Sequence, residues 1–125
     1  MTIRRQSQIL FSSAARTATI VSSVVSAEEV ISSIFAINVS AASATPSVVF
    51  SIEGKDPLSG TFYNIIDSAA ITATGITTIQ VGMNIIAAAN VAANEMLPAE
   101  YRVTATHGDA DSITYTVGVT HLVQN

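Results

Sequence analysis

The chain has 125 residues and a formal net charge of −4. Its charged residues are only five Lys or Arg and nine Asp or Glu. It contains no cysteine, which excludes disulfides, thiolate catalysis and Cys-based metal sites. Five basic residues are too few for the clustered Lys and Arg that nucleic-acid binding requires. No apolar run approaches the roughly 20 residues of a membrane-spanning helix, and the first ten residues lack the apolar core of a signal peptide. We therefore expect a soluble protein made in the cytoplasm, with no nucleic-acid or membrane partner.

The scarcity of charge also predicts a covered surface. About a quarter of the residues of a typical soluble domain are charged, whereas here the fraction is 11%. Ser, Thr and Ala are abundant instead, so much of the outside consists of neutral hydroxyl and methyl groups. We expect part of this surface to lie against another chain, and the isolated protein to be an oligomer.

The N-terminus is predicted to be an extended arm over residues 1–15, followed by the folded domain over residues 16–125. The arm contains a short apolar patch at Ile9, Leu10 and Phe11. This patch has no partner within its own segment, so the three residues are candidate interface anchors that bury against a neighbouring chain. A frayed terminus is the alternative interpretation.

From Thr17 onward, apolar and polar residues alternate with the period of half-buried β-strands. The inner-facing residues of the clearest strands are Ile31, Phe35, Ile37 and Val39; Val48, Phe50 and Ile52; Tyr101, Val103 and Ala105; and Ile113, Tyr115, Val117 and Val119. Turn signals recur roughly every 8–12 residues. The pattern predicts an all-β fold, an antiparallel β-sandwich of jelly-roll or immunoglobulin-like type with about seven or eight short strands.

Three segments interrupt the alternation. Residues 84–95 include an Ala-rich run that could form a short helix capped by Asn84 or an irregular crossover, and both remain open. Residues 54–60 and 107–111 are rich in Gly and Asp and predict tight turns. If loop tips bind a ligand, the candidate contacts in these two turns are Lys55, Asp56, Asp109 and Asp111.

No motif indicates catalysis. His107 and His121 lack the spacing of a zinc site, and a structural role is the better interpretation of both. Asp109 and Asp111 resemble the start of a calcium loop, but the twelfth position is Thr120 where such a loop needs Glu. Neither a nucleophile elbow nor a phosphate-binding glycine loop is present. We expect no enzyme activity and no catalytic, metal-binding or cofactor-binding residue.

Several turn and strand-start motifs carry a resemblance to known proteins. The motifs are TPSVVFSIEGKDP at 45–57, SGTFY at 59–63, ATG at 73–75, LPAEYRV at 97–103, THGDA at 106–110 and YTVG at 115–118. With them, the chain resembles a family of small structural proteins encoded among the head and tail genes of tailed bacteriophages. The strands before Ala41 are richer in Ser, Val and Ile than we expect of that family, which suggests a more apolar N-terminal interface here.

The resemblance implies a β-sandwich that is part of the virion. The first expectation is a capsid decoration, or cement, protein that forms a homo-oligomer, with a trimer favoured, and contacts the major capsid protein or other virion proteins. The alternative is a neck, tail or fibre component that acts as a binding module for a host surface or another virion protein. Neither role needs a cofactor.

Overall fold

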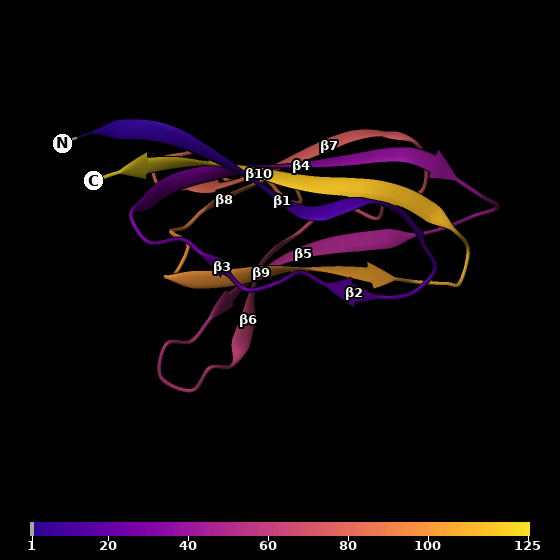
Figure 1. Cartoon of the computed structure of the whole chain (residues 1–125), viewed down its shortest axis with the longest axis horizontal. Coiled ribbons are helices and arrows are strands. Elements are labelled where there is room, and N and C mark those ends of the chain that lie inside the picture. Colours follow the sequence, from indigo (N-terminus) through magenta and orange to yellow (C-terminus); the bar gives the residue numbers. More distant parts are fainter. Residues whose placement is uncertain (1) are drawn as a thin grey trace.

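The strands form two layers. The computed structural model describes residues 2–125, which fold into two five-stranded sheets packed as a β-sandwich (Figure 1). Sheet A has the order β1 (Ile3–Arg16), β10 (Ile113–Gln124), β4 (Val30–Ala42), β7 (Gly75–Gly82) and β8 (Ala92–Asn94). Sheet B has the order β2 (Ile20–Val21), β9 (Glu100–His107), β5 (Val48–Lys55) and β6 (Phe62–Asp67), with β3 (Val25–Ser26) also paired to β9. Neighbouring strands are antiparallel, except that β7 and β8 are parallel.

The alternating sequence produces the two faces of each sheet. In β10, every second residue from Ile113 to Val123 is buried, and the residues between them are half-buried on the outer face. β5 shows the same alternation along its whole length. Successive side chains of a strand point to opposite faces, so these patterns place the apolar set between the sheets. The inner-facing residues predicted for β5, β9 and β10 are all buried.

Aromatic rings fill the middle of the core. Tyr115 meets the ring of Phe50 at 5.0 Å and that of Phe11 at 6.1 Å, both edge to face. Phe35 of sheet A meets Tyr101 of sheet B in the same way at 5.7 Å. Edge-to-face contacts of this kind add to the stabilisation that burial provides. The core therefore joins both sheets and includes residue 11.

The predicted N-terminal arm is wrong. β1 begins at Ile3 and pairs with β10 over its whole length, so the sandwich already includes Ile3 and does not start at residue 16. The two ends of the chain lie side by side (Figure 1), with Thr2 and Asn125 exchanging two backbone hydrogen bonds. Phe11 supplies a buried side chain to the core. Met1, the first residue of the predicted arm, lies outside the described residues.

The strand count and the Ala-rich segment also differ from expectation. The described residues form ten strands and not seven or eight, and the strands that were not anticipated are β1, β3 and β8. The segment 84–95 forms turns and the short strand β8, and contains no helix. Asn84 and Asn90 adopt left-handed backbone conformations, with φ of 61° and 65°. Such conformations are incompatible with a right-handed α-helix through these residues. Between residues 2 and 125, no helix is long and apolar enough to cross a membrane.

Candidate interaction surface

The outer face of sheet A forms a continuous surface across four strands. Residues directly opposite each other in antiparallel strands project from the same face, so the registers of β1, β10, β4 and β7 define rows across the sheet. Three adjacent rows are Ile9, Gly118, Ala36 and Thr78; Ser7, Thr120, Ile34 and Gln80; and Arg5, Leu122, Ser32 and Gly82. We call these twelve residues the sheet A face.

The sheet A face is almost uncharged, because Arg5 is the one charged residue among the twelve. The outer face of sheet B differs sharply. Its charged residues are Glu53, Lys55, Asp67, Glu100 and Arg102. The two faces of one small domain are therefore of opposite character, one neutral and one charged.

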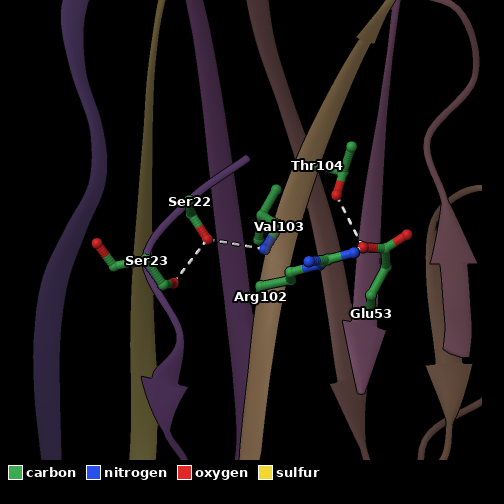
Figure 2. A network of polar contacts seen from close by, with 6 residues as sticks. All are labelled: Ser22, Ser23, Glu53, Arg102, Val103 and Thr104. Carbon is green, nitrogen blue, oxygen red and sulfur yellow. Dashed lines mark hydrogen bonds and ion pairs between the residues drawn. The ribbon is translucent and has the colours of Figure 1, made fainter. Parts of the chain in front are cut away.

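Four of these five charged residues form two ion pairs, one of which is drawn in Figure 2. Arg102 Nε donates to Glu53 Oε1 at 2.7 Å, and the hydroxyl of Thr104 donates to the same oxygen at 2.8 Å. The guanidinium of Arg102 also lies 3.8 Å from the centre of the Phe62 ring. Lys55 makes a second, more exposed ion pair with Glu100. These half-exposed pairs are typical of a face that meets water.

Two shallow hollows run along the sheet A face. The larger, of about 580 Å³, is lined in part by Ile9, Ile34, Ala36 and Gly118. The lack of a side chain at Gly118 contributes to this hollow. A Cβ placed there would come no closer than 3.7 Å to the nearest atom, the carbonyl oxygen of Gln8, so the fold itself does not demand glycine.

The loop between β7 and β8 extends the apolar surface. Ile85 helps to line the smaller hollow, of about 280 Å³, beside Ile34 and Leu122. The next residue, Ile86, is 91% exposed. Further exposed apolar side chains on or beside this loop are Met83, Val91 and Met96. Exposed apolar residues that gather in one region are typical of a contact with another molecule.

The three predicted interface residues are separated by the structure. Ile9 is 74% exposed and belongs to the sheet A face. Leu10 occupies a β-bulge in β1 and packs partly against the core. Phe11 is only 4% exposed, so its ring is not available to a neighbouring chain. Of the three, Ile9 alone presents its side chain fully on the surface.

The four predicted loop contacts lie at opposite ends of sheet B. Strands β5 and β9 are antiparallel, so the turn after Lys55 lies beside Glu100, whereas the turn after His107 lies beside Val48. The two turns are thus separated by the length of β5 and form no common site.

Three of these four residues stabilise loops: two of them hold their own turn, and Asp111 joins its turn to the connection between β4 and β5. Asp56 accepts hydrogen bonds from the hydroxyl of Ser59 at 2.5 Å and the amide of Leu58, which lower the pKa of its carboxyl group. Asp109 accepts a bond from the amide of Asp111. Asp111 in turn accepts bonds from the amide and hydroxyl of Thr45.

Each histidine is bonded to a tyrosine of the core. His121 Nε2 lies 2.7 Å from the hydroxyl of Tyr101, and His107 Nε2 lies 3.0 Å from that of Tyr115. Burial lowers the pKa of both imidazoles and raises the pKa of both phenols. Among residues 2–125, no three His, Cys, Asp or Glu side chains gather where they could hold a metal ion.

Two residues of the sheet A face could have been recognised from their phase in the sequence. Ile34 and Leu122 are large apolar residues at positions out of phase with the buried alternation of β4 and β10. Comparison with known proteins adds no assignment: the chain matches no protein-family model, and a search of curated proteins gives no significant match.

Proposed function

We propose that this protein is a structural component of a tailed-phage particle, a capsid decoration protein that attaches through the sheet A face. The contrast between the neutral sheet A face and the charged, ion-paired outer face of sheet B carries this proposal. The resemblance of the turn and strand-start motifs to phage structural proteins supplies the setting. The partners are further copies of the chain and the major capsid protein or another virion protein.

A neutral face suits attachment to a large assembly. Burying a charge against a partner carries a desolvation cost that the new contacts must offset, and the sheet A face would bury only that of Arg5. Its Ile, Ala, Thr and Ser side chains give weak contacts individually. Many copies on one particle sum such contacts into stable attachment. Stabilising a capsid in this way requires no reaction.

The test uses heads of the phage that encodes the chain, stripped of this protein. Ala36→Glu places a carboxylate in the larger hollow of the sheet A face and should reduce co-sedimentation with the heads strongly, by tenfold or more. Thr106→Glu places the same charge on the outer face of sheet B and should leave attachment unchanged. Equal binding by both variants, or loss only with Thr106→Glu, contradicts the assignment of the face.

One observation favours a second candidate, a neck, tail or fibre module that binds another surface. Leu58 is 96% exposed at the tip of the β5–β6 hairpin, which projects beyond the two layers in Figure 1. A binding tip predicts that Leu58→Ser abolishes attachment while Ala36→Glu has no effect. The position of the protein in intact particles, seen by electron cryo-microscopy, separates head from neck, tail and fibre.

A further inference from the structure

Strand β1 has an open edge. It is the last strand of sheet A on one side and pairs only with β10 among the described strands. All residues from Ile3 to Ile9 are exposed. An edge strand presents unpaired backbone N–H and C=O groups that another strand can bind, and natural proteins usually protect such edges.

The hydrogen-bond pattern identifies which residues point outward. Thr2 and Asn125 exchange two backbone bonds, and the register from Ile3 to Ile9 is regular. Hydrogen-bonded and non-hydrogen-bonded pairs alternate in an antiparallel ladder. Even-numbered residues of this segment therefore bond to β10. The N–H and C=O groups of the odd-numbered residues face the open edge; these are Ile3, Arg5, Ser7 and Ile9.

The open segment ends abruptly after Ile9. The register of β1 against β10 shifts between Ile9 and Phe11, and again between Phe11 and Ala14. β-Bulges bend a strand and increase its twist, which interrupts regular pairing on its free side. The part of β1 that another strand can bind is therefore the seven residues from Ile3 to Ile9.

We propose that this edge binds the same segment of a second copy of the chain, antiparallel, about a two-fold axis at Gln6. Ile3 then lies opposite Ile9 of the second copy, and Arg5 lies opposite Ser7. All four outward-facing residues of each copy exchange backbone bonds, which gives about eight bonds across the axis. The two A sheets become one continuous sheet of ten strands.

The charges select this register over its neighbours. Only registers that place odd-numbered residues opposite odd-numbered ones form the backbone bonds. Shifting the axis to Arg5 places Arg5 of one copy directly opposite Arg5 of the other. Shifting it to Arg4 does the same with the two copies of Arg4. Like charges directly opposite each other destabilise strand pairing. Moving the axis to Ser7 leaves Ile3 and Arg4 unpaired and brings in the bulge at Leu10.

The two-fold pairing at Gln6 also covers apolar surface. Ile3 and Ile9 are 57% and 74% exposed. The pairing brings Ile3 of each copy beside Ile9 of the other copy. No Arg faces another Arg across the axis. This inference is independent of the proposed particle attachment, since edge pairing requires no capsid. It yields a dimer, whereas a trimer requires a different surface.

The first test is sedimentation equilibrium of the full chain over a range of concentrations. The dimer has a mass of about 26 kDa, twice the 13.0 kDa of the chain. Ser7→Pro removes an outward-facing N–H and keeps the backbone bonds to β10, so the variant should sediment as a folded monomer. It also loses the exposed hydrogen bond between the hydroxyls of Ser7 and Thr120, which are 3.2 Å apart. Circular dichroism and thermal melting confirm that it is folded.

A charge exchange tests the register itself. Ser7→Arg places two arginine pairs across the axis and should weaken the dimer about tenfold or more. Adding Arg5→Glu to Ser7→Arg converts both pairs into opposite charges and should restore dimerisation. Thr106→Arg adds the same charge to sheet B and should have no effect.

Amide exchange gives a readout without mutation. The amides of Arg5 and Ser7 should gain protection as the dimer forms, whereas those of Gln6 and Gln8 are protected in monomer and dimer alike. A protein that stays monomeric at all concentrations overturns the proposal. So does a trimer, or a dimer that neither Ser7→Pro nor the charge exchange affects.

Discussion

The imidazole of His121 lies between the sheets with only 3% of its surface exposed, against the hydroxyl of Tyr101. Burial lowers the pKa of His121 and raises that of Tyr101. Both shifts favour the neutral forms, so a neutral phenol and a neutral imidazole share this hydrogen bond. This pair is one of the few polar contacts in a mostly apolar core, where burial disfavours the charged imidazole.

Acidification should destabilise the protein through this pair. Because the folded-state pKa of His121 lies below the ordinary value of 6.5, the unfolded chain takes up the proton first as the pH falls. The contribution to stability is complete above about pH 6.5 and declines below it, by at most about 1.4 kcal/mol per pH unit for each histidine. Urea unfolding at several pH values between about 7.5 and 5.5 measures this slope.

His121→Gln should flatten the slope, because glutamine can bond to Tyr101 but does not titrate. Burial lowers the pKa of His107 as well; the charge of Asp109 opposes this effect, and that of Arg16 adds to it. His107→Gln therefore measures the second contribution separately. A wild-type protein whose stability is constant over this pH range contradicts the prediction.

The second half of strand β1 attaches the strand to the rest of the sandwich through side-chain contacts. The second of its two register irregularities lies between Phe11 and Ala14, and the side chain of Arg16 contacts both β1 and β10 beside it. The guanidinium donates to the carbonyl of Ser12 at 2.7 Å and to that of Tyr115 at 3.0 Å, and it lies 4.6 Å from the centre of the Tyr115 ring. A planar group with several donors can make these contacts together, and an ammonium group cannot.

Arg16→Lys should therefore lower the free energy of unfolding by about 1.5–3 kcal/mol, the value of one lost hydrogen bond to a charged donor. Arg5→Lys is the matched control on the same strand and should change it by less than about 0.5 kcal/mol. Chemical denaturation at a concentration where the protein is monomeric gives both values. An equal effect of the two substitutions would show that the contacts of the Arg16 guanidinium at the bulge do not stabilise the fold.

At the level of elements, alternation predicted the strands that have one buried face and missed those that do not. β5, β9 and β10 are half-buried throughout, so their inner residues could be identified from the sequence. Residues 3–9 are exposed on both faces and therefore lack the pattern. This segment is a strand because of its backbone bonds to β10, more than a hundred positions away in the chain. The residue types of the segment do not predict those bonds.

At the level of the whole molecule, low charge predicted that some surface is covered but did not indicate which one. The answer depends on registers between strands, which bring Ile9, Ala36 and Gly118 into one row although they are far apart in the chain. The predicted patch at residues 9–11 identified one member of that row, Ile9. Phe11 was misassigned because the sequence does not show that β1 crosses the core.

Substituting Gly118 tests whether this glycine is required by the fold or by assembly. It lies in the middle of β10, where glycine costs about 0.5–1 kcal/mol relative to a residue with a side chain, and its own chain leaves room for a Cβ. Gly118→Val should therefore keep or raise the melting temperature. The added side chain fills part of the hollow on the sheet A face and should weaken attachment to stripped heads about tenfold or more if a partner enters there.

The matched control for Gly118→Val is Thr106→Val, which introduces the same side chain on the outer face of sheet B and should leave attachment unchanged. Thermal melting and co-sedimentation are measured on both variants. A Gly118→Val protein that melts normally and still binds fully shows that the hollow stays empty in the assembly, so that the glycine has no role in docking. A variant that melts early indicates that the fold requires glycine at this position, and the assembly explanation for Gly118 is then wrong.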